Sequence, residues 1–373
     1  ASPLKGPLRL LSSIRELDDG VLFTWQKPDR LALFRLTVPI LPADLLLNKH
    51  DFQQHPIGTG NCHFVRLTDQ RSDESLLSFI GVKDATVRLL KVVRGELDLL
   101  QNDLSPELVQ HAKTRSGLRV ESRLGSSFSY LGINFKEPAL AKQEVRLAIA
   151  HAIDRTKLAN TIMHQLVTPS ANIFTPDHWC GLPSATIGIA FDPDRARTLL
   201  SQAGYDLTHN RLKLTFKTST DPTRLRLATV YQDMLKAVGI DLEVSSQDFG
   251  SFYHDIRQGN FQLYGLSWVG VKSPEIFEYA FASYSTPPSG ANRGFYHDAH
   301  YDELIANALA EDFLTNMAEK YREIQTYMLK QLPMIPLWHD HQVLVMRRTI
   351  KGYTLAEDGR YDGLLQLVKT LSA

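Results

Sequence analysis

Arg211-Leu-Lys-Leu-Thr-Phe-Lys217 is the stretch that decides the fold, together with the residues that follow it as far as Trp268. Polar and apolar residues alternate in this heptapeptide, so its apolar side chains share one face of a predicted strand. Asp221 and Pro222 are typical of a helix start, as a capping residue and as a first helical residue. Gly239 is typical of a helix end. The sequence therefore predicts a strand over 211–217 and a helix over 222–238.

The same order of elements is then repeated. Ile240, Leu242 and Val244 predict a second strand, the apolar residues of 249–256 recur at helical spacing, and 260–268 predicts a third strand. Strands joined by helices at such short spacing are typical of parallel pairs with right-handed connections. The sequence therefore predicts an α/β fold.

Candidate ligand contacts lie at the end of the third predicted strand. Open α/β sheets bind ligands beyond the carboxyl ends of their parallel strands, which indicates Trp268 and the loop 269–274 with Val271 and Ser273. Further aromatic residues near this position are Phe249, Tyr253, Tyr264, Tyr279 and Tyr284. Phe249 and Tyr253 lie on the apolar stripe of the predicted helix, which favours the core. We therefore expect Trp268 to line the ligand site.

The rest of the chain predicts further elements of both kinds. Strands are expected over 9–12, 20–26, 127–135, 335–346 and 364–368, and helices from Asp84 to Gly95 and over 138–158, 192–203, 301–310 and 315–332. His55-Pro-Ile-Gly-Thr-Gly60 predicts a compact turn, because it lacks the glycine spacing and the following helix of a dinucleotide loop.

The composition excludes several classes of function. Forty-one basic residues balance forty-one acidic ones among 373, with no run of like charge, so neither nucleic acid nor an anionic membrane is an expected partner. Cys62 and Cys180 are too few for a zinc framework, and whether they pair is left open. No GxSxG, HExxH or phosphate-loop motif occurs, so we expect a protein that is not an enzyme and has no cofactor.

Histidines offer a second kind of chemistry. The chain has thirteen, and those of His339-Asp-His341 share one face of the predicted strand 335–346, so a pair of metal or haem ligands is geometrically possible. His178-Trp-Cys180 is a second short cluster. Exposed or hydrogen-bonded histidines at the edge of a lobe are the alternative, and we favour it.

Several motifs, in their order and spacing, resemble one transport family. They are His55–Gly60, Arg88-Leu-Leu, Arg94-Gly-Glu-Leu-Asp98, Tyr130-Leu-Gly-Ile-Asn134, Val145–Arg155, Phe191–Leu200, Gly259-Asn-Phe, Ser267-Trp268 and Pro333-Met-Ile-Pro-Leu-Trp338. Together they resemble the extracytoplasmic solute-binding proteins of the dipeptide, oligopeptide and nickel ABC importers, family 5. The resemblance covers nearly the whole chain.

The resemblance implies a two-lobed periplasmic-binding-protein-like fold of type II, with lobes joined by crossing hinge strands. Lobe I would comprise 1–125 and 342–373, lobe II would comprise 126–341, and the crossings would be Tyr130–Asn134 and Leu337–Val345. The implied ligand contacts add Tyr264, Tyr130, Asn134 and Trp338 to Trp268, Val271 and Ser273.

The implied function is to bind a peptide or peptide-like solute outside the cytoplasm, in the periplasm or at the membrane, and to deliver it to an ABC permease in the inner membrane. Two alternatives share the fold. One is a ligand-sensing domain of a regulatory protein, and the other is a carrier of haem or of a metal chelate.

Two departures from the family pattern carry expectations of their own. The opening strands of the first lobe and most of a small extra domain are expected to be missing. The stretch between Gly60 and Asp84 is shorter than is usual in the family, which indicates either a missing internal segment or a divergent lobe. In peptide binders of the family an aspartate holds the ligand's amino group, and by register from Trp268 that place is Val271. Because a valine cannot pair with an ammonium and Lys272 would repel it, we expect a ligand that is blocked, neutral or anionic there, unless an acid such as Asp248 or Glu275 substitutes.

Overall fold

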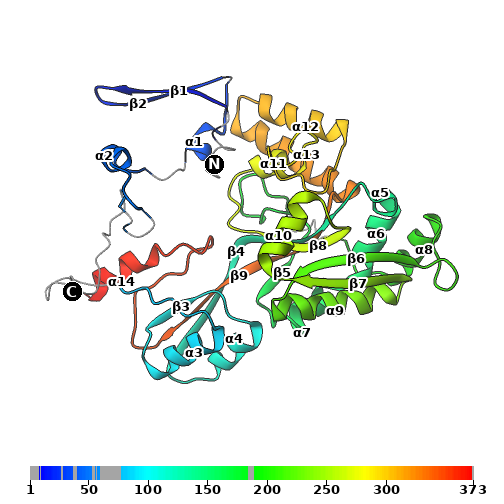
Figure 1. Ribbon diagram of the computed structural model, residues 1–373, viewed down its shortest axis with the longest axis horizontal. Helices are drawn as coiled ribbons and strands as arrows, with labels where there is room; N and C mark the ends of the chain where they lie inside the picture. Colours follow the sequence, from blue (N-terminus) through cyan, green and yellow to red (C-terminus); the bar gives the residue numbers. More distant parts are fainter. Residues whose placement is uncertain are drawn as a thin grey trace. The chain divides into compact units, whose positions relative to one another are not determined.

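A computed structural model of the chain describes residues 8, 10–26, 28–36, 40–52, 55, 57–58, 77–183 and 189–371. It divides into two compact units, 1–81 and 82–371, which are described separately below (Figure 1). The expected turn His55–Gly60 lies only partly among the described residues, and Cys62 lies outside them. Within the described part, no helix is both long enough and apolar enough to cross a membrane.

The first unit contains an antiparallel hairpin and two short helices. The hairpin pairs β1 (Leu11–Leu17) with β2 (Gly20–Trp25), and the helices are α1 (Ala32–Arg35) and α2 (Ala43–Leu47). The strand predicted over 20–26 is confirmed as β2. The first strand runs from Leu11 to Leu17 and shares only Leu11 and Ser12 with the predicted 9–12, because the two-residue turn Asp18-Asp19 pairs Leu17 with Gly20 and so extends the hairpin.

The second unit is built on a mixed sheet with the strand order β3-β9-β4-β8-β6-β7, and β5 pairs with β9. The parallel pairs are β6 with β7 and β6 with β8, and the other pairs are antiparallel. This arrangement confirms the α/β class and the parallel strands predicted over 211–268. The strands are β3 (Leu99–Gln101), β4 (Leu118–Ile133), β5 (Val167–Pro169), β6 (Leu212–Ser219), β7 (Ile240–Gln247), β8 (Leu263–Trp268) and β9 (Met334–Arg347).

Helices surround this sheet, with α9 against β6 and β7, and α12 beside α13 (Figure 1). The predicted caps are in place, since the side chain of Asp221 accepts from the backbone N–H of Arg224 and that of Asp84 accepts from Val87. The helices are α3 (Ala85–Arg94), α4 (Pro106–Lys113), α5 (Pro138–Ala141), α6 (Gln143–Ala152), α7 (Arg155–Thr161), α8 (Pro193–Gln202), α9 (Pro222–Lys236), α10 (Phe249–Gln258), α11 (Glu275–Phe281), α12 (Ala299–Ala310), α13 (Leu314–Gln331) and α14 (Gly363–Leu371).

The structure corrects two of the predicted elements. The helix expected over 138–158 is three helices, because the backbone leaves the helical conformation at Ile153 and Asp154 caps a new helix through the N–H of Lys157. The strand expected over 364–368 is the helix α14, whose Leu364 and Leu367 are spaced to face one core. Helix α11 was not predicted.

Strand β9 contributes residues to three apolar clusters among the described residues of the second unit, and β4 contributes to two of them. Leu131, Ile133, Ile335 and Leu337 belong to the largest cluster, together with the helices and strands of 140–263. The other ends of the same two strands carry Leu118, Val343 and Val345 in a second cluster and Leu344 and Met346 in a third. The predicted strand 335–346 is confirmed, and β4 begins earlier than predicted.

A bulge interrupts the long β4–β9 pair near its middle. The register shifts between Leu124 and Ser127, opposite His341 and Asp340. Gly125 lies inside this shift, where a Cβ atom would stand 2.6 Å from the carbonyl oxygen of Asp340. The bulge therefore requires a residue without a side chain, and it lies at the boundary 125/126 expected between the lobes.

Candidate functional site

Strand alternation separates the predicted site residues onto two faces of the sheet. Tyr130, Tyr264 and Trp268 share one face, since Tyr130 pairs with Leu266 and the side chains at 264, 266 and 268 point the same way. Trp338 pairs with Ser129 and points to the opposite face, into the largest apolar cluster. The structure therefore brings together Tyr130, Tyr264 and Trp268, but not Trp338.

The three aromatic rings on the first face contact one another directly. The rings of Tyr130 and Trp268 stack with centroids 5.8 Å apart and an interplanar angle of 9°. Tyr130 and Tyr264 meet edge to face at 6.0 Å, and their hydroxyl oxygens are 3.4 Å apart. Burial raises the pKa of both tyrosines, so they stay neutral.

Gly132 makes room for this aromatic group. It lies opposite Tyr264 in the β4–β8 pair, and a Cβ atom there would stand 2.1 Å from the ring of Tyr264. No side chain fits at that distance, so the tyrosine ring lies across β4 only because residue 132 is glycine. This close packing positions Tyr264 beside Tyr130.

Arg293 completes the group, although sequence reasoning missed it. Its guanidinium lies over Trp268 at 5.1 Å from the ring centroid and over Tyr253 at 5.3 Å, and Nη2 donates to the hydroxyl of Tyr253 at 3.0 Å. Residue 293 lies in the loop before α12, outside the repeated strand and helix units, so hydrophobic periodicity gave no signal for it.

Val271 lines a separate, open cleft of about 420 Å³. The backbone N–H of Val271 donates to the carbonyl of Ser126, which fixes the loop after β8 against β4. The other lining side chains include Arg123, Phe174, Thr175, His178, Lys272, His339, Glu357 and Asp358. The ligand loop predicted after Trp268 therefore does border a hollow.

Four of the charged side chains in this cleft are paired, whereas Asp177, which also lines it, forms no ion pair with another described residue. Lys272 Nζ forms an ion pair with Asp358, and Arg123 Nη2 with Glu357 at 2.5 Å. Lys272 was expected to repel an ammonium. Because Asp358 offsets its charge, the repulsion between Lys272 and a ligand ammonium is weaker than the sequence indicated. Asp248 lies elsewhere, because its side chain caps α10 through the backbone N–H groups of Gly250 and Ser251.

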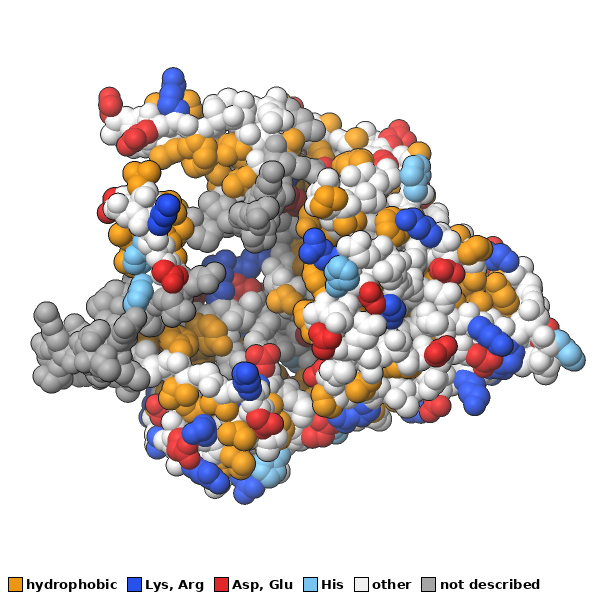
Figure 2. Space-filling view, viewed as in Figure 1, with side chains coloured by type: hydrophobic (Ala, Val, Ile, Leu, Met, Phe, Trp, Pro, Cys, Tyr) orange, Lys and Arg blue, Asp and Glu red, His pale blue; other side chains and the backbone are white. Residues whose placement is uncertain are grey.

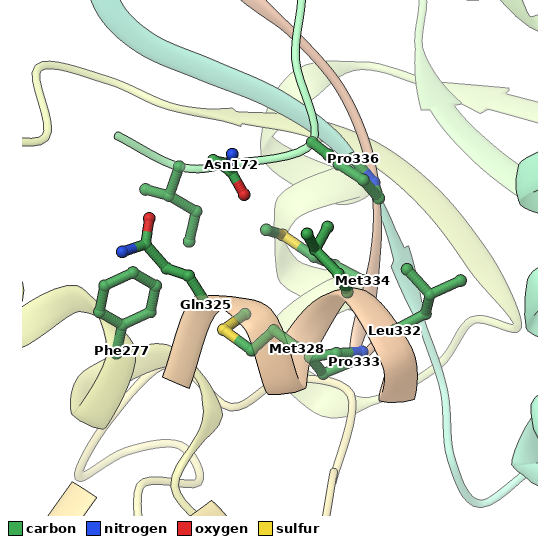
Figure 3. Close-up of a pocket in the computed structure, with 11 residues that line it drawn as sticks. Asn172, Phe277, Gln325, Met328, Leu332, Pro333, Met334 and Pro336 are labelled. Carbon is green, nitrogen blue, oxygen red and sulfur yellow. The ribbon is translucent and has the colours of Figure 1, made fainter. Parts of the chain in front are cut away.

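A further small pocket, shown in Figure 3, shares lining residues with the cleft of Val271 and with a pocket lined by Trp268. It shares Ile173 with the cleft of Val271, and it shares Pro333 and Met334 with the pocket of Trp268. Phe277, Met328 and Met334 make it mainly apolar, while the buried side-chain oxygens of Asn172 and Gln325 have no hydrogen-bond partner among the described residues. Its volume of about 10 Å³ admits only a water-sized group.

Two other predicted contacts form bonds within the chain. Asn134 is buried, and its Nδ2 donates to the carbonyls of Gly259 and Phe261 at 3.2 and 2.7 Å, while its Oδ1 accepts from the N–H of Lys136. Ser273 Oγ accepts from the N–H of Glu275 at the start of α11. Both side chains thus hold turns of the backbone.

Phe249 differs from the prediction of a core residue. Helix α10 buries Phe252 and Ile256, whereas Phe249 is 58% exposed and its ring stacks on Tyr253 at 5.9 Å. The reason is its position as the first helical residue after the Asp248 cap, beyond the edge of the buried face. Tyr279 and Tyr284 are exposed as well.

The histidines divide between the cleft and its surroundings. His339 is buried and packs edge to face on Phe128 at 5.1 Å, and burial lowers its pKa to about 4. His178 stacks on Phe174 at 4.0 Å, and burial lowers its pKa too. Over the described ranges no group of three or more His, Cys, Asp or Glu side chains could hold a metal ion. Cys180 is buried as a free thiol, whose pKa burial raises to about 12.

Charged side chains are interspersed over the described surface on the face shown in Figure 2, with acidic and basic groups beside one another. On this face, therefore, positive and negative side chains are mixed locally, and no large region carries charge of a single sign.

Residues 76–290 match the family described as bacterial extracellular solute-binding proteins, family 5 Middle. The chain belongs to this family. A curated relative of this family 5 protein is the dipeptide-binding protein of Escherichia coli K12, 21% identical over 382 residues that cover 94% of the chain and 70% of the relative.

Solved structures show the fold of this family 5 protein. A periplasmic binding protein DppA from Helicobacter pylori, in complex with the peptide STSA, has a TM-score of 0.78 at 23% identity and covers 98% of this chain and 77% of that chain. NikZ from Campylobacter jejuni, in complex with Ni(L-His), has a TM-score of 0.78 at 21% identity, with coverage of 97% and 79%. The predicted periplasmic-binding-protein-like fold is confirmed.

Proposed function

We propose that this family 5 protein is the solute-binding component of an ABC importer, and that it binds a peptide or peptide-like solute outside the cytoplasm for delivery to a membrane permease. The family match carries this proposal, supported by relatives named for peptide binding. The aromatic group at Trp268 and the cleft at Val271 supply a recognition surface, because ligand sites combine apolar walls with a few oriented polar groups.

We also propose that binding occurs between two lobes, 1–125 with 342–373 and 126–341. The division of the apolar clusters along β4 and β9 supports this, as does the bulge at Gly125. The C-terminal residues pack at the same end as β3, where Tyr353 donates to Gln101 and Gln101 Nε2 donates to the carbonyl of Gly359. In this arrangement β4 and β9 cross from one lobe to the other.

Within this site we propose Trp268, Tyr130, Tyr264 and Val271 as ligand contacts. The first three form one aromatic group, and Val271 lines the cleft that shares Ile173 with the small pocket of Figure 3. Asn134 and Ser273 instead form hydrogen bonds with the backbone, and Trp338 packs in the largest apolar cluster.

Equilibrium dialysis against a library of di- to pentapeptides tests the function, with bound peptides identified by mass spectrometry. The wild-type protein should retain a subset of the library at micromolar affinity, and heat-unfolded protein should retain none. Retention of no peptide at all would contradict the proposal.

A metal chelate is the second candidate, because His178 and His339 both line the cleft of Val271. Nickel with L-histidine, added to the same dialysis, would identify it. Nickel retained only in the presence of histidine, and lost in His178→Gln, would favour a chelate over a peptide.

A further inference from the structure

We propose that Arg293 anchors a carboxylate of the ligand, with Trp268 as its partner in binding. This inference rests on the proposed function as a peptide binder and adds the chemistry of one ligand end. Four observations carry it: the partners of the guanidinium, the donors around it, the size of the pocket, and the loop that holds it.

The guanidinium of Arg293 is half-buried without a counter-charge. Its hydrogen bond to Tyr253 has a neutral oxygen as acceptor, the hydroxyls of Tyr130 and Tyr264 also interact with it, and it lies over the rings of Tyr253 and Trp268. All of these partners are neutral, and no carboxylate among the described residues forms an ion pair with it. A guanidinium carries five N–H donors in a planar fork that matches a carboxylate, so an anion would supply the counter-charge that these neutral partners do not.

The groups around Arg293 are donors as well. The indole Nε1 of Trp268 is buried and has no hydrogen-bond partner among the described residues. The hydroxyls of Tyr130 and Tyr264 lie in the same pocket, and because one of them donates to the other, one hydroxyl proton is left for a further acceptor. A pocket that offers a cation and unpaired donors is complementary to an acceptor with negative charge, and it would leave an ammonium without a partner.

The size of the pocket fits one end of such a group. Between Tyr130, Tyr264, Trp268 and Arg293 it has a volume of about 20 Å³, which admits a water-sized group such as a carboxylate oxygen but no side chain. We therefore expect the carboxylate to enter the pocket and the rest of the ligand to extend away from it.

The loop of Arg293 is held firmly on both sides. Asn292 is buried, and its Nδ2 donates to the carbonyls of Ala282 and Tyr296, while its Oδ1 accepts from the N–H of Tyr296. Gly294 accepts from the N–H of Phe135, and a Cβ there would stand 2.3 Å from the carbonyl oxygen of Ile133. Such a preformed position lowers the ordering cost of binding.

Arg293 also joins α10 to β8 by its contacts with Tyr253 and Trp268, so its removal is expected to lower stability whether or not it binds ligand. The test therefore needs a readout that a structural role alone would not change. The preference between a peptide with a free C-terminal carboxylate and its amide is such a readout, because both peptides meet the same folded protein.

The experiment uses the full chain and two libraries of di- to pentapeptides, identical except that one carries C-terminal amides. The wild-type protein should retain the free acids at least about tenfold more tightly than the amides, since a charge-assisted hydrogen bond is lost with the carboxylate. Arg293→Gln should abolish the preference, Arg293→Lys should keep part of it, and Arg257→Gln, which removes an exposed charge from α10, should leave it unchanged.

Equal retention of acids and amides by the wild-type protein would overturn the inference while leaving peptide binding in place. A preference that survives in Arg293→Gln would overturn it too. Retention of neither library would instead contradict the proposed function, and the inference with it.

Discussion

At the scale of single residues, Gly132 shows how one missing side chain shapes the site. A Cβ at 132 would collide with the ring of Tyr264, so Gly132→Ala should displace that ring and destabilise the fold by about 1–3 kcal/mol, the usual cost of overpacking. Urea unfolding measures this. Gly117→Ala is the matched control, because nothing lies within 4 Å of a Cβ there. Equal stability of the two variants would show that Tyr264 can move freely.

His339 makes stability depend on pH. Its pKa falls from 6.5 to about 4 on burial, so the unfolded chain takes up a proton at a higher pH than the folded one. The contribution of neutral His339 to the free energy of unfolding is therefore fully present above pH 6.5. It is lost as the pH falls toward 4, by about 3 kcal/mol at most. When the free energy of unfolding is plotted against pH over this range, the wild type should show a steeper slope than His339→Gln. Parallel curves would contradict the lowered pKa of His339.

Val271 is predicted to decide whether the site accepts a free amino group at the other end of the ligand. With a valine where peptide binders carry an acid, N-acetylated peptides should bind at least as tightly as free amines, and Val271→Asp should reverse the order. Calorimetry on matched pairs measures both. If the wild type prefers the free amine by tenfold, about 1.4 kcal/mol, then another acid supplies the charge.

At the scale of elements, Asp154 separates two helices that periodicity alone joined into one. Its side chain accepts from the N–H of Lys157, so Asp154→Ala should cost about 1 kcal/mol as a lost helix cap. Thermal unfolding would show it. Asp194→Ala, at an exposed position in the first turn of α8, should change stability by a few tenths of that amount. A similar effect of both substitutions would argue against the cap.

Predictions succeeded where local signals were complete. The strands and helices of 211–268 were predicted because caps, glycine stops and alternation agree there, and the third predicted strand does end at Trp268, as β8. Helix α14 was missed because short apolar runs fit either period, and only packing against Leu344 and Met346 decides between them. Arg293 was missed because its role depends on neighbours distant in sequence, which no local pattern encodes.

At the scale of the whole chain, we propose that β4 and β9 form the shared frame of two lobes, with recognition on the sheet face that carries Tyr130, Tyr264 and Trp268. Membership in family 5 gives the fold and the general role. We propose that Arg293 and Val271 set the chemistry of the ligand that the site accepts.

Calorimetric titration of Trp268→Ala with the peptide that the wild-type protein retains most tightly is the most direct test of this account. The variant should keep its near-ultraviolet circular dichroism outside the lost indole band and its cooperative unfolding, but bind at least about tenfold more weakly, since a central aromatic contact is lost. Phe313→Ala, which removes an exposed aromatic ring before α13, should bind as the wild type does. Unchanged affinity in folded Trp268→Ala would place the ligand elsewhere and contradict the account.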